Sequence, residues 1–407
     1  MRKFKNTSIF ALLLITFLSF SVSTFAQKDP VPTRKGEKWT YSKIGGTYDE
    51  ADPFYPVLQK KTVKVKVIDP KTKKPVMING KPKTKDSSYI EEVAALATVK
   101  VGEKYGFINA SGKMVIAAKY DFVRSFSPDG LAAVGIIGDP FEKWGFVDYT
   151  GREVVPPTYT GVGDFKGGYA SVTQYDLNDP NKPPIGFIDK SGKLAIPFKF
   201  HQAHDFNDGM AAVYSNGKWG FINTKGVMVI SPSFDNVCDF SEGLAKVNKN
   251  LSWGFINKSG REVIAFKYKG SSNDYGVFHN GLAKVSNGRV KGWVNNKGVE
   301  FIRLQYNDAH DFSDRMAAVK QGGRWGFIDQ RGQFRIQPQF FQVGDFSDGL
   351  AAFLDPQTRK WGFINTSGKK VISPKYDEVD RSFNRGIALV KREGKLVYID
   401  KTGKEYN

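Results

Sequence analysis

The segment Trp325-Gly326-Phe327-Ile328-Asp329 decides the fold of this chain, because it recurs nine times, intact or degraded, along the sequence. The clearest copies carry the pairs Trp144-Gly145, Trp219-Gly220, Trp253-Gly254, Trp325-Gly326 and Trp361-Gly362. Successive copies lie 34 to 41 residues apart. A period of about 20 to 50 residues is typical of repeat architectures, in which one small unit is copied. The sequence therefore predicts a tandem array of units of about 36 residues.

A tight turn follows each copy of the motif. The motif ends in Asp or Asn, and a glycine stands three residues later in all nine copies, as in Asp329 and Gly332. Asp and Asn accept hydrogen bonds from downstream backbone amides, and glycine tolerates a positive φ, so each motif is predicted to be a strand that ends in a hairpin turn. One carboxylate per turn falls short of the 6 to 8 oxygens that calcium takes, so no calcium site is predicted.

The rest of each unit reads as further short strands. A β-branched run such as Val371-Ile372-Ser373-Pro374 follows the turn, and its proline is expected to stop the strand. A turn such as Asp345-Phe346-Ser347-Asp348-Gly349 and a strand such as Leu131-Ala132-Ala133-Val134 then lead to the next motif. One unit therefore has three strands, or four if the segment before Asp-Phe also pairs.

The motif strand is apolar on both faces. Alternation places Trp and Phe on one face and Gly and Ile or Val on the other, which fits a strand packed between neighbouring units. The motif glycine allows another backbone or a ring to approach closely. Tyr105, Ile185 and Leu396 replace the tryptophan in other copies. Because leucine fills a core but offers no face for stacking a sugar, the tryptophans are interpreted as core residues.

These motifs resemble the bacterial WG-repeat family, and the resemblance covers about residues 94 to 403. It implies an all-β repeat scaffold and brings with it no catalytic residue and no cofactor. Two arrangements fit: a closed β-propeller, which we favour, and an open solenoid-like stack of sheets. The last copy lacks its third strand, and residues 62–68 and 75–79 alternate like a hairpin. That hairpin would either complete the last unit and close a ring, or cap an open end.

The N-terminus indicates export. Residues 1–26 read as a secretory signal, with Arg2, Lys3 and Lys5 before the apolar residues 9–20 and a small-residue cleavage site ending at Ala26. The apolar run is shorter than the roughly 20 residues of a membrane-spanning helix. We expect a chain without a membrane span after signal removal, located in the periplasm, on the cell surface or outside the cell. Residues 27–93 would form a leader, loose over 27–61 and containing the hairpin, and residues 94–407 the repeat domain.

Charge limits the class of partner. The chain has a formal net charge of +19, and signal removal would leave 57 basic and 41 acidic residues, a net charge of +16. This excess favours anionic partners, which outside the cytoplasm are acidic polymers or proteins, so nucleic acid is not expected. Cys238 is the only cysteine, which excludes an internal disulfide. The chain is expected to be a monomer.

The candidate catalytic and metal-ligating residues do not form a consistent pattern. His204-Asp205 is matched by His310-Asp311, but Arg124, Gly163 and Cys238 occupy the histidine position in other units, which indicates a variable turn position. An aspartate recurs one position later, as in the list Asp164, Asp205, Asp239, Asp311 and Asp345. These carboxylates would either form a ring on one face of a propeller or each close their own turn. We therefore predict no catalytic residue, metal or cofactor, and no enzyme.

Three long loops precede motifs, at residues 135–143, 173–184 and 354–360. Insertions in a regular array map to one face, which is often the binding face. If the first and ninth units adjoin in a ring, the three loops would share one sector. Their candidate binding residues are Phe141, Lys143, Tyr175, Leu177, Lys182 and Lys360. The sequence thus predicts a non-catalytic scaffold that binds an unknown protein or an anionic envelope polymer. The alternative is a glycan-binding or glycan-cleaving module that uses exposed tryptophans and turn carboxylates.

Overall fold

The described part of the chain contains strands, turns and bends but no helix. The computed structural model describes residues 32–35, 38–41, 45–48, 50–52, 55–66, 77–78, 81–82, 84–179, 182, 184–270 and 276–406. The expected signal over residues 1–26 lies outside these residues. Within these residues, no helix is long and apolar enough to cross a membrane.

Each unit of the repeat forms one small antiparallel sheet, and blade four shows the pattern. Its strands β19 (Gln202–Ala203), β20 (Met210–Ser215), β21 (Lys218–Asn223) and β22 (Met228–Phe234) are hydrogen-bonded in sequence order. The motif strand is β21, and the short strand β19 is the segment before Asp-Phe. The unit therefore has the fourth strand that the sequence left open.

The other blades repeat this order with small variations. Blades one to three comprise β4 (Glu50–Ala51), β8 (Thr84–Val101), β9 (Lys104–Asn109) and β10 (Met114–Tyr120); β11 (Phe122–Val123), β12 (Leu131–Ile136), β13 (Lys143–Asp148) and β14 (Glu153–Tyr159); β15 (Gly161–Val162), β16 (Tyr169–Thr173), β17 (Ile185–Asp189) and β18 (Leu194–Phe200). Blades five and six comprise β23 (Asn236–Val237), β24 (Leu244–Lys249), β25 (Ser252–Asn257) and β26 (Glu262–Tyr268); β27 (Leu282–Ser286), β28 (Lys291–Asn295) and β29 (Glu300–Tyr306). Blades seven to nine comprise β30 (Asp308–Ala309), β31 (Met316–Gln321), β32 (Arg324–Asp329) and β33 (Phe334–Phe340); β34 (Gln342–Val343), β35 (Leu350–Leu354), β36 (Trp361–Asn365) and β37 (Lys370–Tyr376); β38 (Glu378–Asn384), β39 (Ile387–Arg392), β40 (Lys395–Asp400) and β41 (Glu405–Tyr406).

The motif glycine is required by a close contact inside its own blade. The pairing of β21 with β22 shifts register between Trp219 and Phe221, as at a bulge. The outer strand passes so close that a Cβ on Gly220 would lie 2.5 Å from the Ile230 carbonyl oxygen. The predicted close approach is confirmed, but the approaching backbone belongs to the same sheet and not to a neighbouring one.

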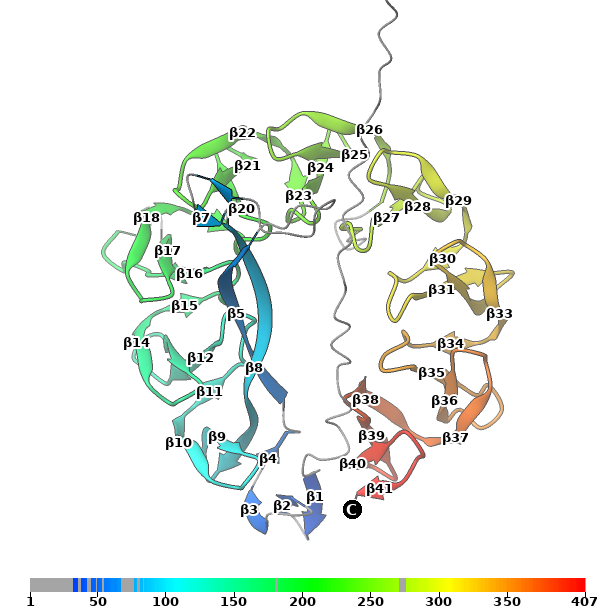
Figure 1. The fold of residues 1–407 in the computed structure, drawn as a ribbon. Helices are drawn as coiled ribbons and strands as arrows, with labels where there is room; N and C mark the ends of the chain where they lie inside the picture. The colour runs from blue at the N-terminus through cyan, green and yellow to red at the C-terminus, as the bar shows by residue number, and fades with distance from the viewer. Residues whose placement is uncertain are drawn as a thin grey trace, which may run out of the picture.

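The nine blades close into a ring, so the fold is a nine-bladed β-propeller (Figure 1). Neighbouring blades share their cores, because the motif strand of one blade packs against the next. For example, Phe221 of blade four and Phe240 of blade five lie 4.9 Å apart between ring centroids, in an edge-to-face arrangement. Trp253, Trp293 and Trp325 are at most 7% exposed, which confirms these three as core residues. Trp144, Trp219 and Trp361 are only partly buried, so the interpretation as core residues is not confirmed for them.

The ring closes through contacts between blades nine and one. An Arg381 Nη1 donates to Asp52 Oδ1 at 2.5 Å, and the Tyr398 hydroxyl donates to the Ala51 carbonyl at 3.3 Å. Beside this seam, β1 (Pro32–Lys35), β2 (Lys38–Tyr41) and β3 (Gly45–Tyr48) form a separate sheet (Figure 1). Tyr41 is buried in one apolar cluster with residues of blade one. The prediction of a loose leader over residues 27–61 is therefore wrong for these strands.

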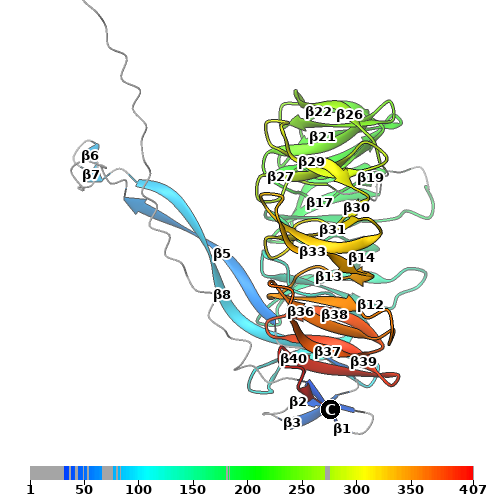
Figure 2. The ribbon, with the colours of Figure 1, turned by 90° about the vertical axis from the view of Figure 1, so that its right-hand side faces the viewer.

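A long two-stranded arm projects from blade one. It consists of β5 (Tyr55–Lys66) and the first part of β8, paired antiparallel from Tyr55 with Leu96 to Lys66 with Thr84. Figure 2 shows the arm leaving one face of the ring. The short strands β6 (Met77–Ile78) and β7 (Lys81–Pro82) pair with each other. The hairpin predicted over residues 62–79 is therefore wrong in its pairing, because alternation identifies a strand but not its partner. The ring closes without this hairpin.

Candidate functional site

A lysine–aspartate link joins successive blades at four junctions. In each, a lysine at or before the first residue of the motif strand pairs with an aspartate 17 residues later, on the way into the next blade. The pairs are Lys104–Asp121 at 2.6 Å, Lys291–Asp308 at 2.8 Å, Lys218–Asp235 and Lys360–Asp377. These links lie at the face that carries the connections between blades.

Three of these carboxylates also accept a hydrogen bond from the next blade's backbone. The donors to Asp121, Asp235 and Asp377 are the amides of Ile137 at 2.9 Å, Asn250 at 2.8 Å and Gly394 at 3.4 Å. In all three, the hydrogen bond from the lysine is the largest influence, and it lowers the pKa of the carboxyl group below its ordinary value. The link therefore holds two blades together and fixes a loop of the second.

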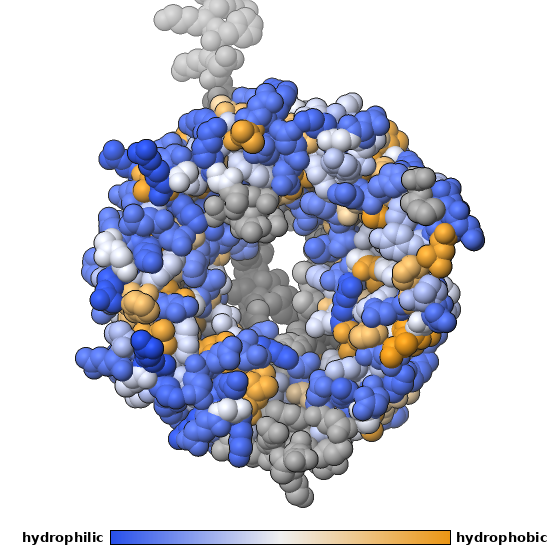
Figure 3. Space-filling model, turned by 180° about the vertical axis from the view of Figure 1, so that it is seen from behind, coloured by the Kyte–Doolittle hydropathy of each residue, from blue (hydrophilic) through white to orange (hydrophobic). Residues whose placement is uncertain are grey.

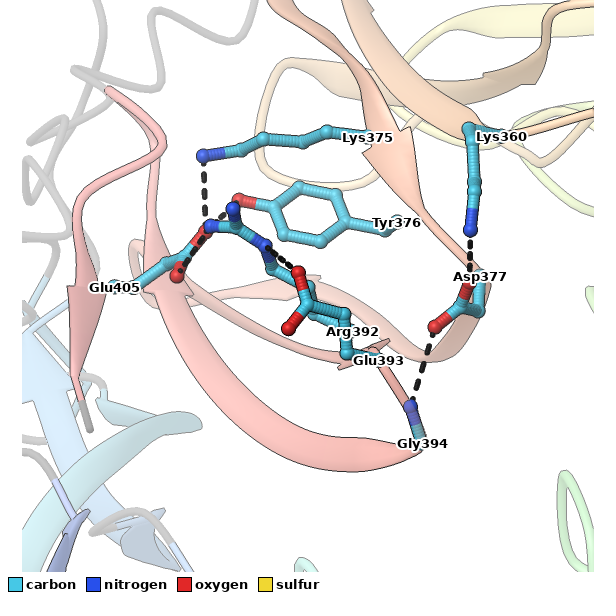
Figure 4. A network of polar contacts seen from close by, with 8 residues as sticks. All are labelled: Lys360, Lys375, Tyr376, Asp377, Arg392, Glu393, Gly394 and Glu405. Atoms are coloured by element: carbon cyan, nitrogen blue, oxygen red, sulfur yellow. Dashed lines mark hydrogen bonds and ion pairs between the residues drawn. The ribbon is translucent and has the colours of Figure 1, made fainter. Parts of the chain in front are cut away.

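Lys360, one of the predicted binding residues, makes one of these links, so its ammonium group already has an acidic partner. Figure 4 shows its ammonium group directed at Asp377, whose other oxygen faces Gly394, beside a second network in which Lys375 and Arg392 hold Glu405. Blades nine and one also separate the loop of blade eight from that of blade two. The structure therefore does not bring the third loop into contact with the loop of blade two, and its part in binding stays a prediction.

The other two long loops do meet. The loop between β12 and β13 and the loop between β16 and β17 bring the rings of Phe141 and Tyr175 to 5.9 Å between centroids. They border a cavity of about 520 Å³, which Lys143, Leu177 and Lys182 also line. We call this the blade two–three cavity. All five predicted residues of these loops therefore lie at one site.

The cavity opens on the face opposite the arm. In Figure 2 the arm leaves one side of the ring and the long loops of blades two and three extend from the other. Figure 3 shows the loop face, where apolar residues interrupt a mostly hydrophilic surface at several places around the ring. At the cavity, Tyr175 and Leu177 are large side chains with 56% and 64% of their areas exposed.

The two lysines of the cavity differ in their partners. Lys182 pairs with Asp176 at 3.1 Å, and this hydrogen bond lowers the pKa of the Asp176 carboxyl group. Lys143 occupies the lysine position of the lysine–aspartate link, but the residue 17 positions later is Thr160. No carboxylate in the described part of the chain pairs with Lys143. Sequence reasoning missed Thr160, although the recurring spacing of 17 residues was a visible signal.

The Thr160 hydroxyl keeps the loop contact of the missing aspartate without its charge. It donates to the Thr173 carbonyl at 3.0 Å and accepts from the Tyr175 amide at 3.2 Å. The Tyr175 contact corresponds to the backbone contacts that Asp121 and Asp235 accept at their junctions. The fold of the loop is thus retained while the lysine is left without its anion.

The histidine and aspartate positions form contacts between blades. His204 Nδ1 lies 2.8 Å from Asp239 Oδ1, and His310 Nδ1 lies 2.7 Å from Asp345 Oδ1. The remaining aspartates of the series are held in the same way by residues of the preceding blade: Asp164 by Arg124, Asp205 by Ser171 and Asp311 by Lys284. These carboxylates therefore neither form a ring of free acids nor close their own turns. The described residues include no group of three or more His, Cys, Asp or Glu side chains placed to hold a metal ion.

The comparisons with known proteins agree with this architecture. A family model described as "WG containing repeat" matches residues 105–136, 144–177, 185–219, 219–250, 253–289, 292–325, 325–354 and 361–395. No curated protein matches the chain by sequence.

Similar solved structures share the fold alone. One is entitled "Crystal structure of the eukaryotic initiation factor"; it is 14% identical, with a TM-score of 0.52 over 76% of this chain and 95% of that one. Hsv2 of Kluyveromyces lactis is 11% identical, with a TM-score of 0.32 over 66% of this chain and 93% of that one. AztD of Citrobacter koseri is 14% identical, with a TM-score of 0.31 over 90% and 95%.

Proposed function

The chain belongs to the WG containing repeat family, and from this premise we propose that it is an exported, non-catalytic binding scaffold. The ligand is a protein or an anionic envelope polymer, docked by the long loops of blades two and three. One observation carries the proposal: these loops place Phe141 and Tyr175 beside a lysine without an acidic partner, at a cavity of about 520 Å³. Exposed aromatic and basic groups of this kind are typical anchors of interfaces.

The contrast with the other blades supports this assignment. Blade four joins its second and third strands by the two residues Asn216 and Gly217, whereas blades two and three use much longer loops at the same place. Long loops on a rigid scaffold commonly carry function. The positive net charge of the chain favours an anionic partner, and the signal-like residues 1–26 support export.

The experiment is capture of partners from envelope extract by the immobilised mature chain. A variant in which residues 137–142 and 174–184 are each replaced by Asn-Gly, as in blade four, should fold and lose the captured partner. A control variant shortens residues 355–359 of blade eight in the same way and should retain it. Undiminished capture by the first variant would place the site elsewhere on the ring.

A glycan titration tests the alternative function. Trp253, Trp293 and Trp325 are at most 7% exposed, so these rings have no free face on which a sugar could stack. The partly exposed tryptophans pack against other side chains: Trp144 against Phe122 and Arg124, Trp219 against His204 and Tyr214, and Trp361 against the core of blades eight and nine. We expect oligosaccharides to leave the tryptophan fluorescence of the folded chain unchanged. A saturable change in fluorescence would support the glycan-binding alternative.

A further inference from the structure

We infer that the blade two–three cavity binds an acidic peptide segment, with a carboxylate of the peptide on Lys143 and an apolar side chain against Phe141 and Tyr175. This inference rests on the proposed function and names the ligand class of the same site. The ligand is a protein partner that presents Asp or Glu next to an aromatic or aliphatic residue.

The repeat itself shows what a lysine at this position binds. At three other junctions the lysine just before the motif aromatic residue has a carboxylate partner: Lys104, Lys218 and Lys360 pair with Asp121, Asp235 and Asp377. The backbone at Lys143 follows the same strand geometry, because β13 pairs with β12 and β14 in the register that β21 has with β20 and β22. The ammonium group of Lys143 therefore lies where an external carboxylate can take the place of the missing aspartate.

Three other junctions between consecutive blades also lack the link. At the junction of blades three and four, the lysine position is Pro184 and the acid position is His201, so no cation is present. At the junction of blades five and six, Ser252 stands at the lysine position and Lys269 at the acid position. Lys269 donates a hydrogen bond to the Ser252 hydroxyl at 2.8 Å. At the junction of blades seven and eight, Arg324 stands at the lysine position and Phe341 at the acid position, beside a smaller cavity of about 380 Å³. The junction of blades two and three differs from all of these, because there a cation without an acid lies at a cavity of about 520 Å³ that two long loops line.

The lining of the cavity favours a peptide over an acidic polysaccharide. Phe141, Leu177 and Phe198 present apolar surface next to Lys143. A peptide can bury an aromatic or aliphatic side chain against these three residues and place its backbone near Gln174 and Asn178, which also line the cavity. The hydroxyl groups of a uronic acid placed against the three apolar side chains would lose water without gaining hydrogen bonds from them. The volume of about 520 Å³ lies within the range of about 300–1,000 Å³ typical of ligand pockets.

The charge of the cavity fits a single carboxylate. Its lining includes two lysines and one acid, since Lys182 is already paired with Asp176. One positive charge therefore remains, on Lys143. A hydrogen bond between charged groups contributes about 1.5–3 kcal/mol, which corresponds to about a tenfold change in affinity or more.

The test is a substitution that supplies the carboxylate internally. In Thr160→Asp the chain would regain the acid that pairs with the lysine at three other junctions, so the variant should fold and unfold at or above the temperature of the parent. His201→Asp is the matched control, because it adds the same charge at the same position of the next junction, where Pro184 replaces the lysine. Lys143→Gln removes the cation directly.

The probe is a phage-displayed library of random dodecapeptides, selected on the immobilised mature chain. We expect the enriched peptides to carry Asp or Glu beside an aromatic or aliphatic residue. The tightest peptide, measured by fluorescence anisotropy, should lose about tenfold or more in affinity with Thr160→Asp and with Lys143→Gln, and less than about twofold with His201→Asp.

Several outcomes would overturn the inference: a library that yields no acidic binder, an acidic binder that is insensitive to Thr160→Asp, or polygalacturonate binding that Thr160→Asp abolishes while peptides do not bind. The proposed function fails separately. If loop trimming abolishes partner capture but Thr160→Asp does not affect it, the scaffold stands and the acidic-peptide assignment falls. If trimming leaves capture unchanged, the proposed binding face itself is wrong.

Discussion

The motif glycine gives a sharp test at the scale of one residue. In Gly326→Val, the new Cβ would lie 2.6 Å from both the Ile336 carbonyl oxygen and the Pro338 nitrogen. Because these are backbone atoms of the outer strand, the sheet must distort, and we expect a loss of about 2 kcal/mol or more in the free energy of unfolding. Urea denaturation measures this loss. Gly344→Ala is the control, since its Cβ would meet Ala352 at an ordinary 3.6 Å; equal midpoints for both variants would refute the close contact.

Local residue chemistry was the most predictable part of the structure. Asp329 Oδ1 accepts from the amides of Arg331 at 2.9 Å and Gln333 at 3.0 Å, and Gly332 has a φ of +78°, which confirms the predicted turn. The turn depends on five consecutive residues, so the sequence contains all of its determinants. The contact at Gly326 involves a strand ten residues away and a bulge, and neither the partner nor the bulge is visible in the motif.

Cys238 should be unreactive in the folded chain. The thiol is 5% exposed, and burial raises its pKa to about 11, so very little thiolate forms near neutral pH. With Ellman's reagent at pH 8, we expect slow labelling of the native chain and rapid labelling in urea. Rapid labelling without denaturant would contradict the burial of this side chain.

At the scale of the element, the lysine–aspartate links predict acid sensitivity. The lysines lower the pKa values of Asp121, Asp235 and Asp377 below the ordinary 3.8. A lowered pKa in the folded state stabilises the fold above pH 3.8, and the stabilisation is lost as the pH falls through the lowered value. The urea midpoint of the parent should therefore fall more steeply below pH 4 than that of a variant with all three residues changed to Asn. Parallel pH profiles would show that the links do not stabilise the ring.

The candidate site was predictable from its loops but not from its electrostatics. Insertion lengths identified the loops that carry Phe141 and Tyr175, because an insertion is visible in any alignment of repeats. Lys360 looked equivalent to Lys143, since both precede a motif tryptophan. The structure separates them through the residues 17 positions later, Asp377 and Thr160, which the pairing of the motif strand with the outer strand of the same blade brings beside the lysine.

At the scale of the whole molecule, the arm should be dispensable for closure. Joining Leu58 to Glu92, which are paired across the arm, by an Asn-Gly turn would remove its distal part and keep its base. We expect a soluble monomer with the thermal stability of the parent, because the arm leaves the face of the ring and supplies no strand to blade nine (Figure 2). Sedimentation and calorimetry provide the measurement, and aggregation of the shortened chain would show that the arm protects an exposed edge.

Closure of the ring was the least predictable feature. The sequence left an open stack and a closed ring as alternatives, because the contacts that decide between them join Arg381 to Asp52 and Tyr398 to Ala51, more than 300 residues apart. No motif marks Asp52, and residues 27–61 follow no repeat pattern. Their buried Tyr41 and Tyr48 pack with residues of blade one.

The same seam bears on how such a ring can change in evolution. In the described part of the chain, every blade is built from strands in sequence order, and no strand of blade one pairs with a strand of blade nine. Duplication or deletion of one unit in the gene would therefore add or remove a whole sheet without dividing another. In a ring whose last sheet contains strands from both termini, the two termini must continue to pair after any change in blade number. This ring needs only a slightly different angle between neighbouring blades to accept another blade.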